Sequence, residues 1–340
     1  MKKYSVLFLI VLLIACGTEK KNETDNSQQL DVDYILPEVG GEIAEEEYTG
    51  GPTELERRYI SIDNSKYKPG EMPAPKCGVN LDGIEVSTQV MNGAINFITV
   101  TTPQPVTRFF IGIKGVPGYL VYVPENSVEA IEDPDAIMDK SGRKPTHVPD
   151  GPESGYYTYV IPMMMAQEYS GECDLIISAE LADGCITNRS EFHLKEIETR
   201  AGALDVKLSF SNSKDVDLHL FTPSGRHIYF SSSRHGQYIE GGKIYEFGLD
   251  IDSNAGCRID GINKENIYIP EEYIEPGVYK VGVVLYGNCN PDIATSWSVV
   301  ARYNGNPITP LSGQNPATGI FPVGAPSERD ATIVMTFRLQ

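Results

Sequence analysis

The sequence lacks the short motifs that mark the commonest enzyme and metal-site classes. It contains no Cys-x-x-Cys pair, so a structural zinc site is not expected. It contains no Gly-x-Ser-x-Gly elbow and no phosphate-cradling glycine loop, and its five histidines form no metalloprotease motif. We therefore expect a protein that catalyses no reaction.

Positive charge is also scarce. The chain has 28 Lys and Arg against 47 Asp and Glu, which gives a formal net charge of -19. Binding to the phosphates of nucleic acid needs a basic surface, and so does adsorption to anionic lipid. No nucleic-acid partner is therefore expected. An acidic surface suits an envelope protein and divalent cations.

The only long apolar run lies at the N-terminus. Lys2 and Lys3 precede the apolar residues Val6 to Ile14. A charged start, an apolar stretch of about 7–15 residues and a small residue before the cut are typical of an export signal. The run is shorter than the roughly 20 residues of a membrane span, and no later segment is apolar enough for one. Residues 1–15 are therefore interpreted as a signal peptide.

The end of this run, Leu13-Ile14-Ala15-Cys16, resembles the lipobox of bacterial lipoproteins. The resemblance implies that the thiol of Cys16 receives a diacylglyceryl group and that its freed amine is acylated. Several acyl chains hold a protein stably on a membrane, whereas one chain does not. An ordinary signal peptide that contains a cysteine is the alternative. The expected location is the bacterial cell envelope, at the outer membrane, with the lipid as membrane anchor.

The composition favours strands and turns over helices, with 23 prolines, 32 glycines and 19 tyrosines. Residues 16–76 contain few large apolar side chains, so this segment cannot bury enough apolar surface to offset the entropy lost on ordering. We therefore predict that it is a flexible acidic tether. The rest of the chain is long enough for two domains of ordinary size. We predict an all-β protein with two β-sandwich domains in tandem, at residues 77–198 and 199–340.

β-rich runs follow one another in the first of these domains. They occupy residues 94–101, 106–114, 118–123 and 156–165. The polar stretch 125–153 predicts a long loop, and Asp183-Gly184 between two β-rich runs predicts a hairpin. The segment from Gly171 to Leu181 resembles the ending of bacterial immunoglobulin-like domains, and this resemblance implies a sandwich.

The second domain contains the most specific strings. They are Asp215-Val216-Asp217-Leu218-His219-Leu220, Leu249-Asp250-Ile251-Asp252-Ser253-Asn254-Ala255-Gly256-Cys257 and Asn263-Lys264-Glu265-Asn266-Ile267. Together they resemble a largely uncharacterised family of β-sandwich domains in bacterial secreted and surface proteins. The resemblance implies a sandwich here too. The Pro/Gly-rich residues 304–328 are interpreted as an enlarged loop before a last strand at 330–339.

The acidic residues of these strings predict a cation site. Side chains alternate faces along a strand, so Val216, Leu218 and Leu220 should face the core and leave the acidic residues between them on the other face. Like charges on one face destabilise a sheet, and calcium, which takes about six to eight oxygen ligands, relieves the repulsion. The predicted ligands are Asp215, Asp217, Asp250, Asp252, Asn254 and Asp260. The alternative is two solvated acidic strands that never meet.

Five cysteines remain after Cys16, and they should lie in an oxidising compartment where disulfides persist. Because the number is odd, at least one is free or pairs with another chain. Cys257 and Cys289 follow strands that can share one end of the sandwich, so we predict a disulfide between them. Cys173 and Cys185 are the next candidates, and Cys77 can replace either.

These features favour a lipid-anchored envelope protein with a non-catalytic binding, adhesion or scaffolding role, whose ligand is an unidentified protein or glycan. A second hypothesis is an accessory subunit of a secreted hydrolase, or a weak hydrolase that uses a carboxylate pair. A third is a spacer that holds a partner away from the membrane.

Overall fold

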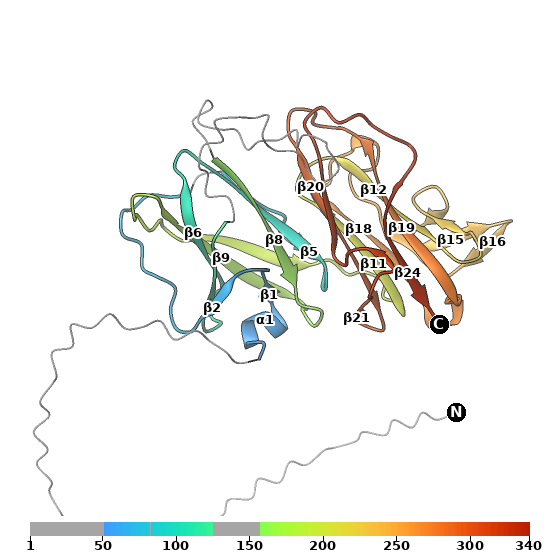
Figure 1. Ribbon diagram of the computed structural model, residues 1–340, viewed down its shortest axis with the longest axis horizontal. Coiled ribbons are helices and arrows are strands. Elements are labelled where there is room, and N and C mark those ends of the chain that lie inside the picture. The colour runs from blue at the N-terminus through green and yellow to red at the C-terminus, as the bar shows by residue number, and fades with distance from the viewer. Residues whose placement is uncertain (1–50, 82, 125–156) are drawn as a thin grey trace, which may run out of the picture. The chain divides into compact units, whose positions relative to one another are not determined.

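The computed structural model describes residues 51–81, 83–124 and 157–340 (Figure 1). Within these residues the chain forms β-strands with very little helix, which confirms the prediction of an all-β protein. No helix in this part of the chain is long and apolar enough to cross a membrane. The predicted signal peptide, Cys16, the first part of the tether and the loop at 125–153 lie outside the described residues.

Two sheets enclose the core of the first sandwich. Their strand orders are β1-β8-β5-β3 and β2-β7-β6-β9-β10-β4. The strands are β1 (Ile60–Ser61), β2 (Lys66–Lys68), β3 (Ile84–Val86), β4 (Gln89–Val90), β5 (Ile95–Thr102), β6 (Val106–Ile113), β7 (Tyr119–Tyr122), β8 (Tyr157–Met165), β9 (Glu172–Leu181) and β10 (Ser190–Glu196). The predicted hairpin is present, because β9 and β10 pair antiparallel on either side of Asp183 and Gly184.

The first folded unit begins well before residue 77. Helix α1 (Glu54–Arg58) starts with a capping box, in which the Glu56 N–H donates to Thr53 Oγ1 and the Thr53 N–H donates to Glu56 Oε2. Leu55 is fully buried in the first core, and β1 and β2 pair with β8 and β7. The prediction that residues 16–76 are all tether is therefore wrong from about Thr53 onward, because this segment buries apolar surface against the sandwich.

The second sandwich also has two large sheets, with a small sheet β14-β15-β16 beside them. One large sheet has the order β17-β18-β11-β20-β21, with β23 also paired to β20, and the other has the order β13-β12-β19-β24-β22. Its elements are β11 (Leu204–Phe210), β12 (Asp215–Phe221), β13 (His227–Ile228), β14 (Ser233–Arg234), β15 (Gln237–Glu240), β16 (Lys243–Tyr245), β17 (Gly248–Ile251), η1 (Ala255–Cys257), β18 (Lys264–Ile269), η2 (Glu271–Tyr273), β19 (Gly277–Gly287), β20 (Thr295–Tyr303), β21 (Asn306–Pro307), β22 (Ser312–Gly313), β23 (Ala317–Phe321) and β24 (Thr332–Leu339).

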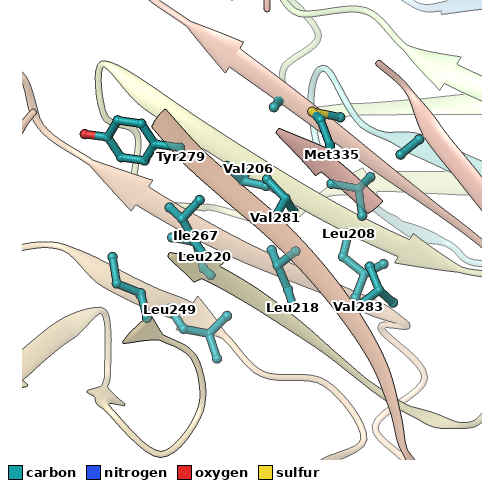
Figure 2. Packing of buried hydrophobic residues seen from close by; sticks show 14 of the residues in the cluster. Val206, Leu208, Leu218, Leu220, Leu249, Ile267, Tyr279, Val281, Val283 and Met335 are labelled. Carbon is teal, nitrogen blue, oxygen red and sulfur yellow. The ribbon is translucent and has the colours of Figure 1, made fainter. Parts of the chain in front are cut away.

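Figure 2 shows the apolar core of this sandwich, with side chains from both sheets packed against each other. Val216, Leu218 and Leu220 of β12 are fully buried in it, as the alternation predicted. The rings of Tyr279 and Phe337 stack with centroids 5.4 Å apart. The burial of these apolar side chains is the main force that holds the two sheets together.

The outer faces of β11 and β18 are buried as well, because the first sandwich covers them. The Lys207 ammonium donates to the backbone oxygen of Asn92 at 2.8 Å, and the Lys264 ammonium donates to Asn96 Oδ1 at 3.0 Å. Burial lowers the pKa of Lys264 to about 7. Alternation of apolar and polar residues along these strands therefore does not separate a core face from a solvent face.

The Pro/Gly-rich segment 304–328 is not a plain loop. It contains β21, β22 and β23, and β23 pairs antiparallel with β20 from Thr295 to Val299. Ala317 is buried, while alternate residues of β23 are exposed. The loop prediction is wrong here because a short edge strand needs few apolar residues and tolerates flanking proline and glycine.

Two disulfides link the described cysteines. Cys257 and Cys289 form one, which confirms that prediction, and Cys77 and Cys185 form the other. Cys173 has a free, half-buried thiol. Of the alternatives that the sequence left open, Cys77 therefore takes the place of Cys173 as the partner of Cys185.

Candidate metal centre

The first half of β12 is a free sheet edge. It pairs with β19 on one side, but on the other side β13 reaches only Leu220 and Phe221. The backbone N–H of Leu218 therefore has no strand partner and donates to Glu265 Oε2 on β18 at 2.6 Å. Because β12 and β18 belong to different sheets, this hydrogen bond places the Glu265 carboxylate beside β12 where the two sheets meet, at the corner of the sandwich.

Glu265 occupies a core-facing position. Ile267 and Ile269 on the same strand point into the core, and Glu265 has the same phase and is 0% exposed. Glu265 is not among the ligands that the alternation of acidic residues predicts. The sequence does contain an indication of it: Glu265 alternates with Ile267 and Ile269, which places a carboxylate on the apolar face of the strand. A charged side chain is rarely fully buried without a partner, so such a position indicates a binding site.

Asp217, Asp252 and Glu265 form a carboxylate triad. One oxygen from each lies within 4.8 Å of the other two. Asp217 and Glu265 are buried and Asp252 is exposed, so the triad lies between the protein interior and solvent. The sequence predicted two of these three residues, and the structure brings them together from strands β12 and β18 and the segment after β17.

Buried oxygens of this group lack hydrogen-bond partners. Within the described residues, no group donates a hydrogen bond to Asp217 Oδ2, to Glu265 Oε1 or to Oδ1 of the neighbouring Asp215. Asp217 is 3% exposed and Glu265 is fully buried, so bulk solvent does not reach these oxygens freely. An unpaired buried carboxylate oxygen is costly, and a cation bound among these oxygens removes that cost.

The triad has an unusual affinity for protons. Burial, followed by the charges of Asp215 and Asp252, raises the pKa of Asp217 to about 8. Burial is also the main cause that raises the pKa of Asp252 to about 6 and that of Glu265 well above its ordinary range. Without a cation the triad therefore retains protons near neutral pH, and a cation must displace them.

Asp215 lies next to the triad and is held by the adjoining loop. Its Oδ2 accepts the backbone N–H of Gly256 at 2.8 Å. It also lies opposite Gly287 of β19, and a Cβ at Gly287 would lie 3.1 Å from the Sγ of Cys257. The Cys257–Cys289 disulfide thus fastens the loop that follows Asp252 to the end of β19.

Asp250 faces away from the triad, contrary to prediction. A β-bulge shifts the register of β17 against β18 between Leu249 and Ile251. Asp250 Oδ1 accepts a hydrogen bond from Asn266 Nδ2 at 2.7 Å on the outer face of the sheet. One extra residue in a strand reverses the facing of everything after it, so Asp252 points to the inner side instead. Asp250 and Asp252, both of which the sequence predicts as ligands, therefore point to opposite sides of the strand.

Asn254 and Asp260 are engaged within the loop between β17 and β18. The Asp260 N–H donates to Asn254 Oδ1 at 3.0 Å, and Asp260 Oδ1 accepts from Ser253 Oγ at 2.7 Å. Asn254 Nδ2 donates to the backbone oxygen of Lys214 at 2.9 Å. The structure gives both residues a role in shaping this loop, and the loop in turn positions Asp252.

The chain resembles known proteins only weakly. No family model matches the chain, and no curated protein matches it. Two solved structures of the C-terminal domain of the Streptococcus agalactiae AgI/II polypeptide BspA align with 71% of this chain and 96% of their own. Their sequence identities are 7% and 8%, and their TM-scores are 0.20 and 0.18. Scores this low do not establish a common fold, so we transfer neither structure nor function from them.

Proposed function

We propose that the chain is a lipid-anchored, non-catalytic binding protein of the cell envelope whose C-terminal sandwich binds calcium at Asp217, Asp252 and Glu265. The observation that supports the cation site is the set of buried carboxylate oxygens without hydrogen-bond partners. The lipid anchor is supported by the sequence around Cys16. Calcium is then part of the folded domain and holds the corner between its two sheets.

The donor set favours a hard cation. All three side chains offer oxygen, which suits calcium, magnesium and manganese, whereas zinc and copper prefer nitrogen or sulfur. Two oxygens that each lie about 2.3–2.6 Å from one calcium ion are at most about 5 Å apart, and the three oxygens here lie within 4.8 Å of one another. Magnesium demands octahedral geometry and keeps several of its waters, so a site in which two of the three carboxylates are buried suits it less.

The alternative of a carboxylate-dependent hydrolase fits the structure less well. The carboxylates are close enough for such chemistry, since retaining glycosidases hold theirs about 5–5.5 Å apart. However, Asp217 and Glu265 are buried, so only Asp252 is accessible to a substrate. His219, the nearest base along β12, shares a hydrogen bond with His227 at 2.8 Å and is itself buried. These contacts support binding over catalysis.

Thermal unfolding of the full mature protein tests the cation site. Calcium at about 100 times its dissociation constant should stabilise the fold by about 2.7 kcal/mol relative to EDTA. A shift of several degrees in Tm follows from that energy for a protein of this size. Melting curves that superimpose in EDTA and in millimolar calcium would exclude a structural calcium ion.

A matched pair of variants assigns the effect to the triad. Asp252→Asn should abolish the calcium-dependent rise in Tm, because it removes one of the three carboxylates. Asp250 bonds to Asn266 on the outer face of the sheet and faces away from the triad, so Asp250→Asn should keep that rise. Equal loss in both variants would indicate that general acidity of the loop, rather than the triad, binds calcium.

The lipid anchor has its own test. Replacing Cys16 with alanine should move the protein from the detergent phase to the aqueous phase in a phase-separation assay, or leave its precursor uncleaved. Cys173→Ser is the control, since it removes a thiol from the folded part of the chain. Unchanged partition of the processed Cys16→Ala protein would refute lipidation at this residue.

A further inference from the structure

Arg329 lies beside the metal centre with unused hydrogen-bond donors. The N–H of the preceding Glu328 donates to the backbone oxygen of Leu285 at 2.8 Å, which holds this segment against β19. The guanidinium carbon of Arg329 lies 3.9 Å from the centroid of the Tyr286 ring. Within the described residues, the guanidinium makes no hydrogen bond or ion pair, and the residue is exposed. Its N–H groups are therefore available to a ligand.

Two observations place this guanidinium close to the triad. Tyr286 directly precedes Gly287, which lies opposite Asp215 in the β12–β19 pair. A Cβ at Gly287 would lie 3.3 Å from Asp215 Oδ2, so this end of β19 is in contact with the carboxylate that adjoins the triad. With calcium bound, the cation and the guanidinium together offset the charges of the three carboxylates, whereas the chain as a whole has a net charge of -19.

A calcium ion in the triad keeps open coordination positions. Three carboxylates hold six oxygens, and one of these, Glu265 Oε2, already accepts the Leu218 N–H. Calcium takes about six to eight oxygens, so one or more must come from water or from a ligand. These positions lie on the side of Asp252, because Asp217 and Glu265 close the other side.

We propose that this site binds a glycan that contains a uronic acid, with the sugar carboxylate on Arg329 and a neighbouring hydroxyl on the bound calcium. The inference rests on the proposed function, since it needs the cation. A guanidinium binds a carboxylate through two parallel hydrogen bonds, and hydroxyl oxygens are ordinary calcium ligands. A sugar acid carries both groups on one ring, whereas an acidic peptide side chain carries the carboxylate alone.

Aromatic rings next to Arg329 also favour a sugar. Phe230 and Tyr286 are half-exposed and meet edge to face, with ring centroids 5.2 Å apart. Half-exposed aromatic rings offer rigid apolar surface at little entropic cost, which suits the apolar face of a sugar ring. An extended acidic protein would instead meet repulsion over the whole of this acidic surface.

Calorimetric titration of the full mature protein tests the inference, with trigalacturonate as the probe. The neutral galactotriose and a hexaglutamate peptide are the comparison ligands. In millimolar calcium, trigalacturonate should bind and galactotriose should bind far more weakly. EDTA should abolish binding of the acidic sugar. Arg329→Gln should weaken it by about tenfold or more, as expected for loss of a charge-assisted hydrogen bond.

The remaining arms separate the two proposals. Arg338→Gln, an exposed arginine on β24, should leave sugar binding unchanged, and Arg329→Gln should leave calcium binding itself unchanged. Calcium binding without a calcium-dependent response to trigalacturonate overturns the inference alone. Absence of calcium binding overturns the proposed function and the inference together. Binding of hexaglutamate in place of trigalacturonate assigns the site to an acidic peptide and also overturns it.

Discussion

Replacing Cys257 and Cys289 together with serine is expected to lower the free energy of unfolding by about 3–4 kcal/mol in the chain-entropy model. The disulfide closes a loop with a sequence separation of 32, which restricts the unfolded chain. A loss of this size lowers Tm by roughly 10 °C for a domain of this length. Denaturant unfolding of the oxidised protein measures the difference.

The free thiol provides the control for that experiment. Cys173→Ser removes a half-buried sulfur without breaking a disulfide, so it should change stability far less. The serine pair should also weaken calcium binding, because the disulfide fastens the loop whose Gly256 N–H holds Asp215. If the pair costs no more stability than Cys173→Ser, the disulfide does not contribute as expected.

Calcium affinity should fall steeply with acidity. Burial raises the pKa of Asp217 to about 8, so below that pH the free site holds a proton that the cation must displace. Each displaced proton reduces the affinity about tenfold per pH unit. The raised pKa of Asp252, about 6, should add a second proton and make the dependence steeper below that pH. Calorimetric titrations with calcium at a series of pH values from 8.5 to 5.5, spaced by about one unit, measure how the affinity changes with pH.

The sign of this effect follows from which state holds the protons. A carboxylate whose pKa is raised in the folded protein binds more protons there than in the unfolded chain between the two pKa values. In EDTA this protonation favours the fold as the pH falls towards 6, whereas in calcium it competes with the ion. The rise in Tm caused by calcium should therefore shrink on acidification, and a rise that is constant from pH 8 to pH 6 would contradict it.

The acidic strings predicted part of this site because strand alternation is a reliable rule over a regular strand. It placed Val216, Leu218 and Leu220 in the core, and it placed Asp217 on the opposite face of the same strand. The rule fails where a strand is irregular. The bulge between Leu249 and Ile251 depends on how β17 pairs with β18, and pairing is a tertiary property that one strand's sequence does not contain.

Glu265 and the start of the first sandwich were missed for different reasons. Glu265 is a ligand candidate only because β12 and β18, which belong to different sheets, meet at the corner of the sandwich. The start of the first sandwich had a local signal, because Thr53 and Glu56 have the spacing of a capping box ahead of a buried leucine. The surrounding acidic composition obscured that signal, since a short helix contributes few apolar residues to the average.

The bulge in β17 separates the spacing of the acidic residues in the sequence from the faces that they occupy. Leu249 pairs with Ile267 and Ile251 pairs with Asn266, so Asp250 is the residue that β17 has in excess of β18. A related sequence that lacks this one residue can keep both pairs, and its aspartate after the strand would still point towards Asp217 and Glu265. Such a sequence would have Leu-Ile-Asp in place of Leu249-Asp250-Ile251-Asp252, without the alternating aspartates. Among relatives of this domain, an aspartate directly after this strand should therefore predict calcium dependence better than the alternating motif does.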